Sequence, residues 1–181
     1  MNSRIPTFES DRLLVFPLTI SDYEKFESGI EPDWQAFSNP YKHLIEGPSP
    51  LLHRIPRVKK DPMFAEIGLL LAVEKDTNIV VGSSGFHDFP DERGMIEVGF
   101  GIVPVKQNQG FGKELLIGMW KFISSRTDVR VLRYTVSPDN APSMHIIHKL
   151  GFTQVGEQVD PEDGVELIFE EHLIDFLARK F

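Results

Sequence analysis

Residues 96–116 read IEVGFGIVPVKQNQGFGKELL, and this stretch decides the fold. An apolar strand leads into a loop, QNQGFGK at 107–113, and the loop leads directly into a helix. A helix N-terminus exposes unpaired N–H groups and the positive end of the helix dipole. Glycines before it let the backbone approach an oxygen-rich group closely. The stretch is therefore compatible with a diphosphate site, and a plain glycine-rich turn is the alternative.

Two well-known phosphate-binding patterns do not fit this loop. A P-loop needs a serine or threonine after its lysine, but Lys113 is followed by Glu114. A dinucleotide-binding fingerprint needs a third glycine, but Leu115 stands in that place. What remains is the pattern Q-x-x-G-x-G, with Gln107, Gly110 and Gly112.

Outward from the loop, strands and helices mix along the chain. A first strand is expected at 11–18, followed by a helix that Thr19 or Ser21 caps. The proline-punctuated stretch 31–62 predicts one or two short helices in a long loop. The other expected elements are three antiparallel strands between 67 and 103, a helix at about 112–125, a strand near 129–136, a helix from Asn140 to Gly151, a final hairpin, and a tail that forms a short helix or frays. This order predicts an α+β domain.

Composition excludes several classes of protein. The chain has 181 residues, a formal net charge of −8 and no cysteine. The acidic balance argues against a general nucleic-acid partner, and the lack of cysteine excludes disulfides and thiolate nucleophiles. His145 and His148 stand three apart on one expected helix without a third ligand, so no metal site is predicted. The absence of a signal peptide or of an apolar run long enough to span a membrane predicts a cytoplasmic protein without a membrane partner.

Together with the loop, a second motif gives the chain its resemblance. Residues 140–152, NAPSMHIIHKLGF, carry N-x-x-S followed by K-L-G-F. With Q-x-x-G-x-G before it in the chain, this resembles the GNAT superfamily of N-acetyltransferases, especially its RimJ/RimL-like branch. The similarity covers roughly 10–172. It implies a GNAT fold: a mixed, mostly antiparallel central sheet of six or seven strands with splayed central strands, flanked by about four helices. One domain is expected at 9–172, with a C-terminal tail at 173–181.

The resemblance implies acetyl-CoA as cosubstrate. In the family the loop amides hold the pyrophosphate, and exposed strand backbone, here at 100–103, holds the pantetheine arm and polarises the thioester carbonyl. An asparagine side chain also binds the arm. The implied cofactor-binding residues are Ile102, Val103, Gln107, Asn108, Gln109, Gly110, Phe111, Gly112, Lys113 and Asn140.

Acetyl transfer to an amine requires that the amine lose a proton. Glu97 is the first candidate for this base, acting through water, because a carboxylate within an apolar strand is costly unless it is solvated or paired. An outward-facing, solvated Glu97 is the alternative. Glu162 and Asp163 in the last hairpin loop are rival bases, for which solvated turn residues are favoured. His87 is favoured as a surface histidine, with a second base as its alternative.

Ser143 is the candidate for the group that faces the CoA sulfur. Many acetyltransferases have a tyrosine where this chain has Ile147, and the RimJ/RimL-like branch has the serine instead. A serine in a capping turn is the other interpretation. Lys106 and Lys113 flank the loop, where they either steer phosphates or are only solvated.

The sequence therefore predicts an acetyl-CoA-dependent N-acetyltransferase that acts by direct attack in a ternary complex. The alternative is a non-catalytic acyl-CoA-binding or sensor module. A small-molecule amine or a peptide N-terminus is the expected acceptor, and a homodimer is expected from family analogy alone.

Overall fold

A computed structural model describes residues 4–47, 49–161 and 164–181. The chain divides into two compact units. Unit 1 consists of Met1–Gly85 and Phe100–Gly118, and unit 2 consists of Phe86–Gly99 and Met119–Phe181.

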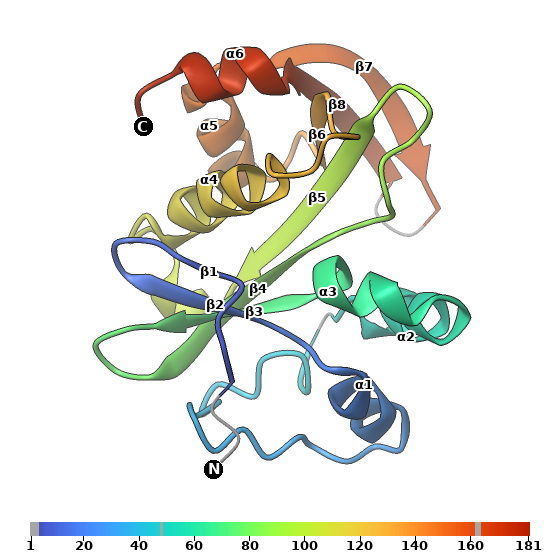
Figure 1. The fold of residues 1–181 in the computed structure, drawn as a ribbon. Coiled ribbons are helices and arrows are strands. Elements are labelled where there is room, and N and C mark those ends of the chain that lie inside the picture. The colour runs from blue at the N-terminus through green and yellow to red at the C-terminus, as the bar shows by residue number, and fades with distance from the viewer. Residues whose placement is uncertain (1–3, 48, 162–163) are drawn as a thin grey trace. The chain divides into compact units, whose positions relative to one another are not determined.

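The described residues form eight strands, six α-helices and two 3-10 turns, labelled in Figure 1. The strands are β1 (Phe8–Glu9), β2 (Leu13–Pro17), β3 (Leu70–Glu74), β4 (Ile79–Phe86), β5 (Met95–Ile102), β6 (Val131–Val136), β7 (Thr153–Asp160) and β8 (Gly164–His172). The helices are α1 (Ile20–Glu27), α2 (Leu51–Lys60), α3 (Ala65–Gly68), α4 (Phe111–Ile123), α5 (Ala141–Lys149) and α6 (Leu173–Ala178), with 3-10 turns η1 (Pro62–Phe64) and η2 (Pro104–Lys106).

The predicted α+β class is confirmed, with a mostly antiparallel sheet in the order β1-β2-β3-β4-β5-β6-β8-β7. The strand count exceeds the six or seven predicted. The additional strand is β1, which is only two residues long and pairs with β2 through Phe8↔Val15 and Glu9↔Leu14. Two residues are too short to show a period-two pattern, so the sequence carried no signal for this strand.

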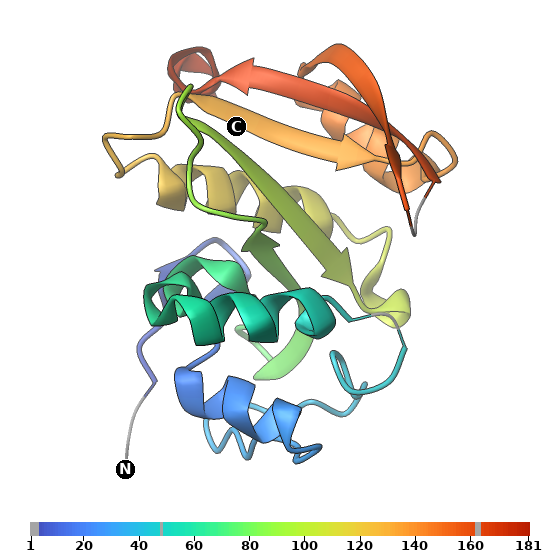
Figure 2. The ribbon, with the colours of Figure 1, turned by 90° about the vertical axis from the view of Figure 1, so that its right-hand side faces the viewer.

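In unit 1, strands β1 to β4 pair antiparallel in sequence order. The predicted cap of α1 is confirmed at Thr19, whose side chain accepts from the Asp22 N–H while the Asp22 side chain accepts from Thr19. This reciprocal arrangement is a capping box. Helices α1 and α2 lie side by side, as Figure 2 also shows in blue and teal.

In unit 2, β6 pairs antiparallel with β8, and β8 with β7. Trp120 is fully buried; its ring stacks on Phe152 with centroids 4.3 Å apart and meets Phe176 edge-on at 5.4 Å. The predicted tail therefore forms α6 and packs through Phe176, because an aromatic anchor offsets the entropy of ordering a terminus.

The predicted ends of α5 are also confirmed. The Asn140 side chain accepts from the Ser143 N–H, and Pro142 lies in the first turn. Gly151 follows the C-cap with φ of 74°, the left-handed region that glycine adopts without steric cost. The helix after the loop is shifted slightly from 112–125 and begins at Phe111.

Candidate functional site

The glycine loop lies in unit 1 between η2 and α4. Gly110 has φ of 85°, and Asn108 has φ of 58°, so the chain turns through two left-handed residues before the helix begins. The loop's own amide side chains brace it. Gln107 Nε2 donates to the Ile102 carbonyl at 2.9 Å, and Gln109 Nε2 donates to the Val105 carbonyl at 3.0 Å. These two glutamines therefore shape the loop through their side chains.

A second set of contacts, which the sequence analysis missed, anchors the loop and the first turn of α4. Glu114 Oε1 accepts from Ser10 Oγ at 2.7 Å and from the Arg12 N–H at 2.8 Å, while Oε2 accepts from Arg12 Nε at 2.7 Å. Arg12 also donates to the Gln109 carbonyl at 2.9 Å. Burial acts to raise the pKa of Glu114, but these hydrogen bonds outweigh it, and the pKa lies below its usual value. The contacts span about a hundred residues of sequence, so no local pattern indicates them.

Two further loop residues have partners within unit 1. Phe111 is buried, and the Arg12 guanidinium lies 4.2 Å from its ring centroid, a cation–π contact. Lys106 Nζ pairs with Glu74 Oε2 at 2.7 Å, and this hydrogen bond lowers the pKa of Glu74. Lys106 is thus an ion-pair partner of β3, which leaves Lys113 as the loop lysine still predicted to steer phosphates.

The predicted pantetheine backbone at 100–103 lies at the end of β5, also in unit 1. The Val103 N–H donates to the Val81 carbonyl at 3.0 Å, and its carbonyl accepts from the Lys106 N–H at 2.9 Å. Both polar backbone groups of Val103 are therefore engaged within the unit. The β4 backbone comes close here, because a Cβ built at Gly82 would lie 2.3 Å from the Gly101 carbonyl oxygen.

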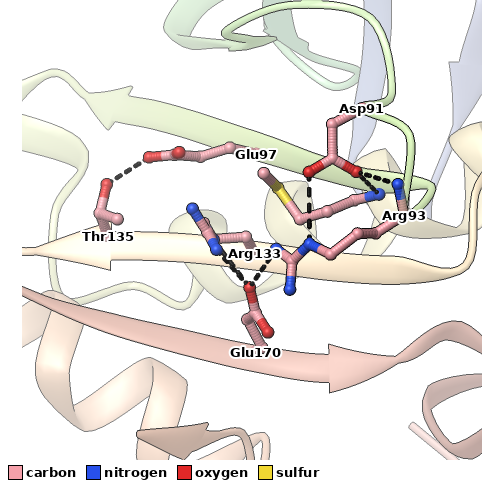
Figure 3. A network of polar contacts seen from close by, with 7 residues as sticks. Asp91, Arg93, Glu97, Arg133, Thr135 and Glu170 are labelled. Carbon is pink, nitrogen blue, oxygen red and sulfur yellow. Dashed lines mark hydrogen bonds and ion pairs between the residues drawn. The ribbon is translucent and has the colours of Figure 1, made fainter. Parts of the chain in front are cut away.

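Glu97 lies in unit 2, where β5 runs parallel to β6. The pairs are Met95↔Val131, Ile96↔Leu132 and Glu97↔Arg133, and β5 continues to Ile102 without further pairs to β6 among the described residues. The Glu97 side chain is 16% exposed, and its Oε1 accepts a short hydrogen bond from Thr135 Oγ1, as Figure 3 shows. Glu97 is therefore a partly buried, hydrogen-bonded carboxylate rather than a fully solvated one.

His87 joins Glu97 from the end of β4. Its Nδ1 lies 3.5 Å from Glu97 Oε1, and its backbone N–H donates to the Glu97 carbonyl at 2.9 Å. The imidazole also lies over Gly99, since a Cβ built there would be 2.9 Å from His87 Nε2. The structure thus brings together Glu97, His87 and Thr135. The pairing of His87 with Glu97 depends on strand register, which the sequence does not reveal.

Ser143 is buried in unit 2 at the first turn of α5, two residues after the helix begins. Its side chain hydrogen-bonds the Tyr134 hydroxyl from β6. Burial raises the pKa of Tyr134 to about 12, the Glu166 carboxylate acts in the same direction, and the Ser143 hydrogen bond opposes both. Asn140 caps the same turn, so Ser143 and Asn140 lie together as the motif predicts.

The remaining predicted residues separate from these clusters. Glu162 and Asp163 lie outside the described residues. His148 packs edge-on against Phe169 with ring centroids 5.4 Å apart, and His145 is exposed. Within residues 4–47, 49–161 and 164–181, no group of three or more His, Asp or Glu side chains is placed to hold a metal ion. The described helices are all too short or too polar to cross a membrane.

Comparison with known proteins identifies the chemistry of this family. A family model described as an acetyltransferase (GNAT) domain matches residues 12–153. Among curated proteins, the uncharacterized N-acetyltransferase p20 of Bacillus licheniformis is 23% identical over 60% of this chain and 61% of its own length. The uncharacterized N-acetyltransferase YjdG of Bacillus subtilis is 34% identical over 45% of this chain and 49% of its own length. The chain thus spans about half to three fifths of these two relatives.

Solved structures show the same fold. A GNAT-family acetyltransferase from Bacillus anthracis has a TM-score of 0.62 at 20% identity, covering 92% of this chain and 98% of its own. Mutant forms of the spermidine/spermine N-acetyltransferase SpeG from Vibrio cholerae have a TM-score of 0.66 at 14% identity, with coverages of 93–94% at this chain's side and 99% at theirs. A ribosomal-protein-S5-alanine acetyltransferase from Vibrio fischeri has a TM-score of 0.65 at 13% identity, covering 93% of this chain and 97% of its own.

Proposed function

Because this chain belongs to the acetyltransferase (GNAT) domain family, we propose that it transfers an acetyl group from acetyl-CoA to a primary amine. The observation that carries the proposal is the loop 107–113, a glycine turn braced by its own glutamines and by Arg12, and followed at once by α4. A preorganised loop at a helix N-terminus suits a pyrophosphate, because its N–H groups are oriented before the ligand arrives.

The proposed cofactor contacts follow the family motif. The backbone of the loop binds the pyrophosphate, with Lys113 adding charge. The Asn140 side chain and the backbone of residues 100–102 bind the pantetheine arm. We assign no contact to the polar backbone groups of Val103, because both are engaged within unit 1. Acetyl-CoA supplies the acyl group as a thioester.

The reaction balances as a direct transfer. The amine nitrogen forms a bond to the acetyl carbon, the carbon–sulfur bond breaks, and the amine loses one proton while the CoA thiolate gains one. A route through an acyl-cysteine is excluded, since the chain has no cysteine. We propose that the amine proton is taken up at Glu97 and the groups in contact with it, and that the Ser143 hydroxyl hydrogen-bonds the thiolate. The Tyr134 hydroxyl orients that serine.

The acceptor is proposed only as a primary amine. The structural relatives include enzymes whose names refer to spermidine and to a ribosomal-protein alanine, and these are a polyamine and a protein residue. The acidic balance of this chain favours a cationic acceptor of either kind. The RimJ/RimL-like branch, the cytoplasmic location and the homodimer stay predictions.

A free-thiol assay with acetyl-CoA and a panel of amines tests the proposal. The panel contains polyamines, amino acids and peptides with free N-termini. We expect amine-dependent thiol release, and a kcat at least about tenfold lower for Ser143→Ala, because that variant loses a hydrogen bond to the leaving group. Ser125→Ala, at the exposed end of α4, is the matched control and keeps the wild-type rate.

The same assay separates the alternative, a non-catalytic acyl-CoA-binding module. Such a module binds acetyl-CoA but releases no thiol with any amine, and its binding is insensitive to Ser143→Ala. Binding without release across the whole panel would therefore replace the enzyme with the module.

A further inference from the structure

We infer that His87 is the catalytic base and that Glu97 acts through it. This inference rests on the proposed function, because it names the atom that receives the amine proton. Three observations in unit 2 carry it: the orientation of the imidazole toward Glu97, the position of the ring over Gly99, and the hydrogen bond that holds Glu97 to Thr135.

The first observation concerns the two ring nitrogens. Nδ1 faces the carboxylate at 3.5 Å, and the strand bond from the His87 N–H to the Glu97 carbonyl at 2.9 Å holds the two residues in register. A carboxylate beside Nδ1 favours the tautomer with the proton on Nδ1, which leaves Nε2 as the basic atom. The same carboxylate stabilises the imidazolium that forms when Nε2 accepts a proton. A separation of 3.5 Å is long for a hydrogen bond, and such contacts tighten when substrate binds.

The second observation concerns access to Nε2. The ring lies over the backbone of Gly99, where a Cβ would come within 2.9 Å of Nε2. The lack of a side chain at position 99 therefore leaves the space that the imidazole occupies. The His87 side chain is 46% exposed, against 16% for Glu97. An amine or a water molecule reaches the imidazole more readily than the carboxylate.

The third observation concerns Glu97 itself. Its Oε1 already accepts from Thr135 Oγ1 and is also the oxygen nearest His87. A carboxylate fixed by a hydroxyl on one strand and an imidazole on another is held in one orientation. Thr135 and Glu97 are thus positioning residues, and they hold the ring at a fixed place on β4.

The proton transfer follows from this arrangement. His87 Nε2 takes a proton from the attacking ammonium or amine, directly or through one water, as the nitrogen bonds to the acetyl carbon. An unperturbed imidazole, with a pKa of about 6.5, matches neutral pH better than an unperturbed carboxylate at about 4.3. The imidazolium then returns the proton to solvent through its exposed side.

The test compares His87→Ala, Glu97→Gln and the double variant in the thiol-release assay, after thermal unfolding confirms that each is folded. We expect His87→Ala to lower kcat by about a hundredfold or more, with acetyl-CoA affinity within about twofold of wild type. The double variant should be no slower than His87→Ala alone, because Glu97 acts only through the ring. Added imidazole should restore rate to His87→Ala and not to Glu97→Gln. His172→Ala, an exposed histidine in the same unit, is the matched control.

Gly99→Ala provides a second variant that keeps the imidazole. Its methyl group displaces the ring, so kcat should fall about tenfold or more while KM for acetyl-CoA is unchanged. If His87→Ala retains wild-type kcat while Glu97→Gln does not, Glu97 is itself the base and the inference is wrong. If His87→Ala is slow but imidazole gives no rescue and the variants' effects add, the role is structural and the inference is again wrong. A wild-type protein without amine-dependent thiol release would overturn the proposed function and this inference together.

Discussion

At the scale of single residues, His43 is a histidine that the fold keeps neutral. Its Nε2 lies 2.8 Å from Ser83 Oγ on β4. Asn39 clamps the His43 backbone, accepting from its N–H and donating to its carbonyl at 3.0 Å each. Burial lowers the pKa of His43 to about 4, since the charged imidazolium is poorly solvated there.

This lowered pKa predicts a pH-dependent stability. Between about pH 6.5 and about pH 4 the unfolded chain binds a proton at His43 that the folded chain does not. The free energy of unfolding therefore decreases as the pH falls through this window, by up to about 3 kcal/mol. Urea unfolding of wild type and His43→Gln at pH 7, 6, 5 and 4.5 measures it. The glutamine variant should show a shallower decline, and parallel curves for the two proteins would refute the assignment.

At the scale of elements, β4 is buried along nearly its whole length and depends on two glycines in unit 1. A Cβ at Gly85 would lie 2.0 Å from the Gly68 carbonyl oxygen, and one at Gly82 would lie 2.3 Å from the Gly101 carbonyl oxygen. Both neighbours are backbone atoms, which cannot rotate away. The glycines thus set how closely α3 and the end of β5 approach this strand.

Gly85→Ala is accordingly expected to destabilise the protein by about 1–3 kcal/mol, because the backbone must move to admit the methyl group. Gly101→Ala is the matched control: a Cβ there meets nothing within 4 Å, and its effect should stay within about 0.5 kcal/mol. Denaturant midpoints of the two variants decide the question. Equal losses would mean that the strand gives way more easily than this geometry implies.

At the scale of the whole molecule, residues near the N-terminus stabilise a loop about a hundred positions later. Ser10 and Arg12 hold Glu114, and Arg12 holds the Gln109 carbonyl, so the proposed pyrophosphate site depends on the first strands of unit 1. The site is therefore a property of the fold and not of the motif QNQGFGK alone.

Binding should be visible as stabilisation. Acetyl-CoA at a hundred times its Kd should stabilise the folded protein by about 2.7 kcal/mol, because it binds the native state alone. Gly110→Val should abolish this rise in Tm, since position 110 has φ of 85° and a branched residue there distorts the loop. Gly29→Ala, also at a positive φ but with nothing near its Cβ, should lower the basal Tm and keep the rise. A ligand-induced rise that survives in Gly110→Val would contradict the assigned loop.

The amino-acid order by itself determined the α+β class, the capped helices α1 and α5, and the family. These features depend on local patterns: a threonine three residues before an aspartate, an asparagine before a proline, and glycines at fixed spacing. Only the tertiary structure decided which side chains share a site. Strand register brings His87 and Thr135 to Glu97, and the β6–α5 packing brings Tyr134 to Ser143. These contacts join residues that are distant in sequence, and a one-residue slip in register would turn each side chain to the opposite face of the sheet.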